Sequence, residues 1–179
     1  MIKLNLGCGS NILESYENID RYVENSNVKN YDILNLPFPD NSVDEILAEH
    51  LVEHLSFAEE KLFFCEAKRV LAEWGVLKIE VPDIEWVFSE FIKQKDLFHD
   101  FYQVGAYDHY FGNGPGGDNK WGVLTTHIWG NQNGVGQFHK NGYTEKKCLR
   151  IGELMGFRSS KIKRDFKKKT QVLICEYEK

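Results

Sequence analysis

The sequence predicts an α/β domain built on a mainly parallel sheet. Short apolar runs alternate with segments of helical periodicity along the chain. A glycine-rich turn, LGCGS, follows the first apolar run directly. The 179 residues, of which 42% are hydrophobic, contain enough apolar material for one core. We therefore expect a single domain over residues 1–179.

Most strands are predicted from apolar runs bounded by turn residues. The first four are expected at Ile2 to Leu6, Tyr16 to Asp20, Val28 to Ile33 and Val43 to Ala48. LPFPDNS, before the fourth strand, is a loop because of its two prolines and its turn-forming Asp-Asn-Ser. VLKIEVP, residues 76–82, is a nearly continuous apolar run, which favours a central strand. The last two strands are expected near 159–165 and 171–177, with the last one antiparallel.

Helix ends are predicted from capping residues. Ser56 is a suitable N-cap, with Glu59 as its capping-box partner, for a helix that runs to about Ala72. Residues 84–98 have helical spacing, and Thr144 caps a final helix that ends at Gly156. Residues 99–142 are rich in Gly, His, Trp and Asn and have no periodicity, which indicates a long irregular insertion. Such loops are usually functional or mobile.

Composition indicates a cytoplasmic protein. No run approaches the roughly 18 apolar residues of a membrane span, and the first residues lack the features of a secretory signal. The four cysteines form no CxxC pair, which argues against a zinc ribbon or a disulfide framework. We therefore expect no membrane partner.

The charge is distributed unevenly along the chain. The net charge is −5, yet residues 158–169 carry seven Lys or Arg and one Asp, or +6, so the rest carries −11. A solvated hairpin turn and a docking patch for an anionic partner both remain open for this cluster. Nucleic acid is not favoured as a partner, because the body is acidic and the cluster lies far in sequence from the glycine-rich turn.

The glycine-rich turn and the end of the second strand together suggest a nucleoside site. Glycines let the backbone approach a ligand that a Cβ would hold away. Asp20, at the end of the second strand, can accept hydrogen bonds from both ribose hydroxyls of an adenosine-containing ligand. The third glycine of a dinucleotide motif is absent, and so is the G-K-[ST] of a phosphate loop.

Five ordered segments carry a more specific resemblance, which covers nearly the whole chain. LNLGCGS, ENID, DILNLPFPDNSVDEI, AEHLVEHL and RVLAEWGVLKIEVPD resemble the successive motifs of class I S-adenosylmethionine-dependent methyltransferases. The closest likeness is to small methyltransferases of the type 11 group, whose C-terminal part is similar to GNQNGVGQFHKNGYTEKKCLRIGELMGF here. The resemblance implies a Rossmann-like fold, S-adenosylmethionine as cofactor, and methyl transfer to a hydroxyl of a small molecule or glycan.

The resemblance also assigns cofactor residues. The backbone of the first turn would lie beside the methionine and ribose moieties, and Asp20 would bind the ribose hydroxyls. Asp32 with the Ile33 amide would contact the adenine edge, and Glu49 would lie near the amino-acid end. The expected cofactor-binding residues are therefore Leu6, Gly7, Cys8, Gly9, Asp20, Asp32, Ile33 and Glu49.

Three residues are candidates for a base that removes the acceptor's proton. His50 ranks first because its expected position is nearest the methyl group, and His139 and Asp83 follow. Aromatic and histidine residues of the later part, Trp121, His127, Trp129, His139 and Tyr143, could form the wall of an acceptor pocket or pack on the core. Methyl transfer requires no metal, and we expect none.

Two other functions are weighed against this one. His50, Glu53 and His54 match the H-x-x-E-H pattern of some zinc peptidases, which would make the chain a zinc-dependent hydrolase. A methyltransferase-like domain could also bind the cofactor, or nothing, and act as a non-catalytic interaction module.

A homodimer is expected from the loop lengths. Residues 7–16 and 21–27, which connect the first three strands, are too short for full crossover helices. Helices on one sheet face should therefore be reduced. A parallel sheet that is apolar on both faces would need cover there, from residues 84–142 or from a second copy.

Overall fold

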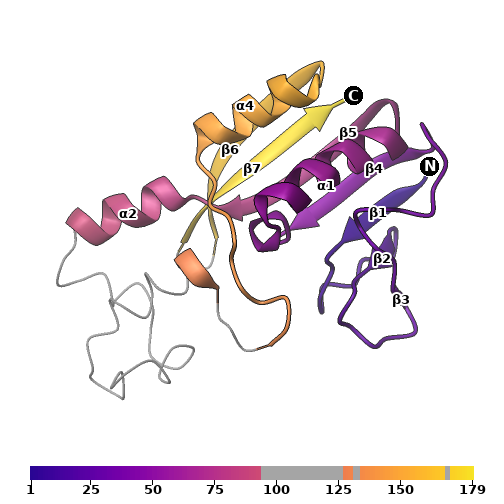
Figure 1. Cartoon of the computed structure of the whole chain (residues 1–179), viewed down its shortest axis with the longest axis horizontal. Helices are drawn as coiled ribbons and strands as arrows, with labels where there is room; N and C mark the ends of the chain where they lie inside the picture. Colours follow the sequence, from indigo (N-terminus) through magenta and orange to yellow (C-terminus); the bar gives the residue numbers. More distant parts are fainter. Residues whose placement is uncertain (94–126, 131–133, 168–169) are drawn as a thin grey trace.

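The fold is a single seven-stranded sheet with helices packed against it (Figure 1). It is seen in a computed structural model that describes residues 1–93, 127–130, 134–167 and 170–179. Within these residues the strand order is β3-β2-β1-β4-β5-β7-β6. Strands β3, β2, β1, β4 and β5 are mutually parallel, and β7 runs antiparallel to both β5 and β6. The predicted fold class is therefore confirmed.

The strand bounds agree with the sequence except in two places. The strands are β1 Lys3–Leu6, β2 Glu17–Ile19, β3 Val28–Lys29, β4 Val43–Glu49, β5 Leu71–Pro82, β6 Ser159–Lys167 and β7 Thr170–Glu178. The third strand was predicted to reach Ile33, but it ends at Lys29 because the chain turns at Asp32, whose carbonyl accepts from the Asn35 amide. The fifth strand begins at Leu71, five residues earlier than predicted.

The predicted helix caps are confirmed. Helix α1, Phe57–Val70, begins with a complete capping box between Ser56 and Glu59, and it ends at Val70 because the chain passes straight into β5. Helix α2 covers Ile84–Lys93, and residues 94–98 of its predicted range lie outside the described residues. Helix α4, Glu145–Met155, has Thr144 as N-cap and ends at the left-handed Gly156. A short 3-10 helix, η1 Val52–His54, precedes α1.

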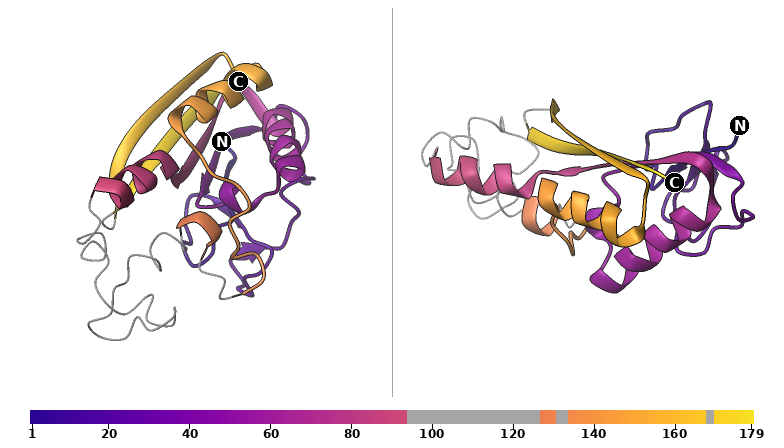
Figure 2. Two further views of the ribbon diagram at one scale, coloured as in Figure 1. Left: turned by 60° about the vertical axis from the view of Figure 1, so that its left-hand side comes forward. Right: turned by 90° about the horizontal axis from the view of Figure 1, so that it is seen from above.

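One face of the sheet carries the core. Helices α1 and α4 lie along this face, as the view from above shows (Figure 2). Alternate residues of β5 and β7, including Leu77, Ile79 and Tyr177, are buried beneath them. The Phe64 ring of α1 meets Tyr177 edge-on at 5.9 Å. Helix α4 lies so close that a Cβ on Gly152 would be 1.9 Å from Ser160 Oγ.

The opposite face of the sheet is polar. Glu45 Oε2 and Oε1 lie 3.2 Å from the Lys3 and Lys78 ammonium groups respectively, and Glu80 pairs with Lys167. Among the described residues no helix covers this face, and the β1–β2 and β2–β3 connections contain none, which confirms the reduced helices. The assumption that both faces are apolar is wrong. Lys78 and Glu80 break the VLKIEVP run at alternate positions, and both point to the polar face.

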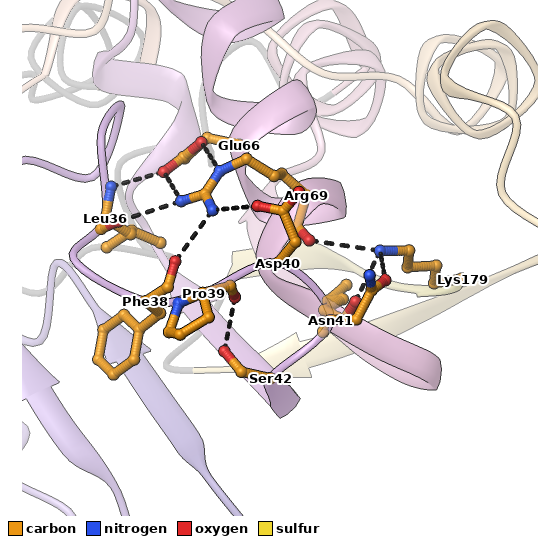
Figure 3. A network of polar contacts seen from close by, with 10 residues as sticks. Leu36, Phe38, Pro39, Asp40, Asn41, Ser42, Glu66, Arg69 and Lys179 are labelled. Atoms are coloured by element: carbon orange, nitrogen blue, oxygen red, sulfur yellow. Dashed lines mark hydrogen bonds and ion pairs between the residues drawn. The ribbon is translucent and has the colours of Figure 1, made fainter.

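The loop between β3 and β4 is attached to α1 by the side chains of Arg69 and Glu66, and Glu66 accepts from the Leu36 amide at 2.6 Å (Figure 3). Arg69 makes most of these contacts. Its guanidinium binds both Glu66 oxygens, the Asp40 carboxylate, and the carbonyls of Leu36 and Phe38. All five N–H groups of the arginine therefore have an acceptor. The loop leads directly from Tyr31–Leu34, which line the cavity described next.

Candidate functional site

A cavity of about 710 Å³ opens at the carboxyl ends of β1, β2 and β4. This is where open α/β sheets bind ligands. The cavity brings together almost every residue that the sequence predicted for the cofactor, and of those eight only Leu6 is absent from its wall. The predicted residues in the wall are Gly7, Cys8, Gly9, Asp20, Asp32, Ile33 and Glu49.

The glycine-rich turn forms the floor between β1 and β2. Gly7 has a φ of +64°, and a Cβ there would lie 2.7 Å from Leu51 Cδ1. Gly9 has a φ of +51° with open space where a Cβ would stand. Side chains at these positions would be strained, and at Gly7 also crowded. The turn thus keeps the backbone exposed to the cavity.

Asp20 connects this turn to the end of β2. Its Oδ2 accepts from the Gly9 amide at 3.0 Å, and its Oδ1 accepts from the Tyr22 amide at 2.7 Å. Cys8 lies beside it, and burial together with the nearby Asp20 charge raises the pKa of the thiol. Cys8 is therefore a neutral thiol at physiological pH.

A buried amide pair supports the residues after the turn. Asn5 donates to the Asn11 carbonyl at 2.8 Å and to Asn18 Oδ1 at 2.9 Å. Asn18 in turn donates to the Leu13 carbonyl at 3.0 Å. Sequence reasoning did not assign these residues. Asn11 also donates to Glu49 Oε2 at 3.2 Å, which links the turn to the end of β4.

His50 has an unusual environment at the end of β4. Its φ of +51° lies in the left-handed region. Its Nδ1 lies 3.2 Å from Glu53 Oε1 and its Nε2 lies 3.5 Å from Glu80 Oε1. Hydrogen bonds donated by the ring to these two carboxylates raise the His50 pKa to about 10. A ring that is protonated at neutral pH cannot accept a proton, so the geometry corrects the prediction of His50 as a base in the free protein.

His54 and His139 meet in the same cavity wall. Their ring centroids are 4.7 Å apart and the rings meet edge to face. Burial lowers the pKa of His54, which is therefore neutral at physiological pH. The buried Glu53 carboxylate completes the group, and the ligand atoms of these three residues lie within 4.8 Å of one another.

Asp83 does not belong to this wall. It is 1% exposed, and its Oδ1 accepts from the Glu85 and Trp86 amides at the start of α2. Its Oδ2 accepts from Gln171 at 2.8 Å and from Arg164 at 3.1 Å. With both oxygens engaged, Asp83 is a helix cap and an ion-pair partner rather than a base for the cavity.

Comparisons with known proteins agree with this geometry. Residues 13–79 match the family profile of a methyltransferase domain. The fold is similar to an S-adenosylmethionine-dependent methyltransferase from Methanosarcina mazei, with a TM-score of 0.61, 16% identity, and coverage of 99% of this chain and 91% of that one. It is also similar to one from Archaeoglobus fulgidus, with a TM-score of 0.60, 15% identity, and coverage of 99% and 85%.

A third similar structure is the Burkholderia thailandensis 1,6-didemethyltoxoflavin-N1-methyltransferase. Its TM-score is 0.62 at 12% identity, and the match covers 99% of this chain and 70% of that one. No curated protein sequence matches the chain. Part of the chain, residues 13–79, thus matches a methyltransferase-domain profile, and the fold of the whole chain is similar to those of S-adenosylmethionine-dependent methyltransferases.

The similar structures confirm the predicted Rossmann-like methyltransferase fold. The profile match over residues 13–79 supports the predicted enzyme class and cofactor. None of the described helices combines the length and hydropathy that a membrane crossing needs. The cytoplasmic location stays a prediction.

The zinc-peptidase arrangement is not formed in this structure. Its motif needs both histidines on one helix face as ligands. His50 lies before η1 and turns both ring nitrogens toward carboxylates, whereas His54 turns toward His139. The hydrolase alternative therefore has no geometric support.

A second cavity, of about 600 Å³, adjoins the first. His139 and Lys140 line both cavities. Two other predicted acceptor-wall residues, His127 and Trp129, line the second cavity, and Trp121 lies outside the described residues. Tyr143 is fully buried and donates to Glu60 at 2.5 Å, so it packs in the core.

Proposed function

We propose that this protein is a methyltransferase that transfers a methyl group from S-adenosylmethionine to a hydroxyl of a small molecule or glycan. The observation that carries the proposal is the gathering of seven predicted cofactor residues around one cavity at the carboxyl ends of β1, β2 and β4. The residues fit the cofactor chemically, since Gly9 leaves open space for a ligand and Asp20 offers a carboxylate for ribose hydroxyls.

The other cofactor contacts are assigned by their place around the cavity. Asp32 and Ile33 would contact the adenine edge, and the backbone of Gly7 and Cys8 would lie beside the ribose and methionine moieties. Glu49, at the end of β4, would attract the ammonium of the amino-acid end.

The second cavity is the proposed acceptor site. It combines aromatic residues, including Phe57, Phe88 and Trp129, with the amide of Asn141. Asn141 Nδ2 is buried without a hydrogen-bond partner among the described residues, so it can donate a hydrogen bond to a bound methyl-acceptor molecule. A small-molecule acceptor has a parallel in the Burkholderia enzyme, whose structure holds 1,6-didemethyltoxoflavin with S-adenosylhomocysteine. The glycan class rests on the sequence resemblance.

The reaction is an in-line displacement at the methyl carbon. The acceptor oxygen forms the new C–O bond, the S–C bond breaks with its electron pair kept by sulfur, and the hydroxyl proton leaves to a base or to water. The protein contributes mainly alignment, which supplies on the order of 7–11 kcal/mol in favourable cases. Of the three predicted bases, His139 alone keeps a suitable place for this role in the metal-free protein, because His50 is cationic and Asp83 lies outside the cavity.

Calorimetry with S-adenosylhomocysteine tests the cofactor assignment. Asp20→Asn keeps the shape of the side chain but removes its charge, and we expect a weaker affinity by about 1.5–3 kcal/mol, the scale of hydrogen bonds to a charged group. Glu153→Gln is the matched control, because this carboxylate lies on the exposed face of α4. Equal affinity of wild type and Asp20→Asn would remove the ribose assignment. Binding without turnover over a panel of hydroxyl acceptors would support the non-catalytic alternative.

A further inference from the structure

Three side chains that the cofactor assignment does not use converge in the cavity wall. Glu53 and His54 belong to η1, and His139 comes from the segment before α4. One ligand atom from each lies within 4.8 Å of the others. We propose that Glu53, His54 and His139 bind one divalent transition-metal ion, whose open coordination positions face the cavity. Sequence analysis predicted no metal, and its zinc alternative used His50 instead of His139.

Both histidines present the same ring nitrogen to the proposed ion. His54 Nδ1 lies 3.1 Å from the Phe138 carbonyl, and His139 Nδ1 lies 2.9 Å from the His127 carbonyl. Because a carbonyl can only accept, each Nδ1 carries the hydrogen, and Nε2 is left as the ligand atom. Metal-binding histidines commonly donate their other ring N–H to a backbone carbonyl in this way.

Glu53 supplies the negative charge. Its side chain is only 2% exposed, and Oε2 is buried with no hydrogen-bond partner among the described residues. An unpaired carboxylate oxygen in such a place costs free energy, which a bound cation would recover. The other oxygen, Oε1, faces His50 Nδ1 at 3.2 Å. His50 is thus the outer hydrogen-bond donor that orients a ligating carboxylate.

The backbone fixes the two halves of the site to each other. The Glu53 carbonyl accepts from the Lys140 amide at 2.8 Å and from the Asn141 amide at 3.1 Å. These bonds hold the segment that carries His139 against η1. Around a tetrahedral ion with bonds of about 2.0–2.2 Å, ligand atoms lie about 3.4 Å apart, so binding would shorten the present separations, which reach 4.8 Å at most, by up to about 1.4 Å.

The donor set selects the class of ion. Two imidazole nitrogens and one carboxylate oxygen suit zinc, manganese, iron or cobalt better than magnesium or calcium, which prefer oxygen ligands throughout. Three protein ligands leave positions for water or substrate. An acceptor hydroxyl bound there would have a lower pKa and lose its proton more easily to water. This role rests on the proposed function, whereas ion binding does not.

The test uses the full chain, purified without a histidine tag and stripped with a chelator. Titration calorimetry with zinc or manganese chloride should give one ion per chain, and magnesium chloride should bind at least tenfold more weakly. Cobalt substitution should give a visible d–d band more intense than that of aqueous cobalt, which reports a protein site of low coordination number. His139→Ala and Glu53→Gln should each weaken zinc binding at least tenfold. Cys65→Ser, which removes an exposed thiol, is the control for adventitious zinc and should bind as wild type.

Each outcome separates this proposal from the cofactor assignment. Circular dichroism confirms that a variant is folded, and S-adenosylhomocysteine binding is measured on the same samples. Zinc affinity that is equal in wild type, His139→Ala and Glu53→Gln would overturn the metal site, as would the absence of stoichiometric binding of any of these transition ions. Retained S-adenosylhomocysteine affinity in those samples would leave the proposed function intact. Zinc binding without S-adenosylhomocysteine binding would support the metal site and overturn the proposed function.

Discussion

Replacing Arg69 by lysine tests how the loop before β4 is held. The five N–H groups of the guanidinium donate to Glu66 at 2.8 and 2.7 Å, to Asp40 at 2.6 Å, and to the Phe38 and Leu36 carbonyls at 2.9 and 3.1 Å. A lysine ammonium has three donors and cannot bind a carboxylate in the forked geometry. Arg69→Lys therefore loses at least two of the five hydrogen bonds.

The magnitude follows from those two bonds. Each contributes about 0.5–1.5 kcal/mol net, which gives about 1–3 kcal/mol for the pair. The Arg69 side chain is 34% exposed, and water replaces part of what is lost, so we expect the lower half of that range. About 1.5 kcal/mol corresponds to a decrease in Tm of about 3–6 °C for a chain of this size.

Urea unfolding at neutral pH measures this loss. Arg150→Lys is the matched control, because Arg150 pairs with Glu153 on the exposed surface of α4, where we expect a change of under about 0.5 kcal/mol. S-adenosylhomocysteine affinity should also fall in Arg69→Lys, since the same loop continues from Asp32 in the cavity wall. Equal unfolding midpoints for Arg69→Lys and the wild type would refute the reasoning.

Two further predictions concern acid stability and assembly. Hydrogen bonds with Ser56 lower the folded-state pKa of Glu59 from 4.5 to about 2. Its contribution is therefore complete above pH 4.5 and is lost as pH falls toward 2, so urea unfolding should show the wild type losing about 1 kcal/mol more than Glu59→Gln over that interval. Because the open sheet face is polar, we no longer expect it to drive dimerisation, and light scattering should give the 20.8 kDa monomer. Twice that mass, reverting to the monomer in Leu47→Glu, would show that the face is an interface.

Local signals in the sequence were sufficient for the helix ends. The Ser56 and Glu59 capping box and the Thr144 cap each lie within four residues of the turn that they stabilise, so no tertiary knowledge is needed. The end of α1 is different. Nothing in Leu71 or Ala72 marks a strand, and β5 begins there because pairing of Leu71 with Val43 of β4 overrides the helical pattern.

The polar sheet face could have been predicted from the sequence. Lys78 and Glu80 alternate with buried Leu77, Ile79 and Val81. This period of two is the signature of a strand with one polar face. The homodimer was expected from the short strand connections together with the premise that a parallel sheet is apolar on both faces, and this alternation contradicts the premise.

The charge of His50 depends on a neighbour that the sequence does not reveal. The spacing from His50 to Glu53 shows one carboxylate, but one carboxylate alone leaves open which partner holds the proton. Glu80 becomes the second because β5 lies parallel to β4 and pairs Glu80 with Glu49, the residue before His50. Strand register therefore decides that this histidine is an acid in the free protein and not a base.

Strand topology alone predicts where the cofactor residues lie, but it does not predict where His139 lies. Cofactor residues follow the ends of β1, β2 and β4, and parallel strands bring such ends to one edge of a sheet whatever the loops do. His139 belongs to no strand. It reaches the wall because the Glu53 carbonyl holds the Lys140 and Asn141 amides, which are backbone contacts that leave no trace in residue identity. The proposed acceptor site therefore depends on a segment that backbone contacts, and not strand topology, bring to the cavity.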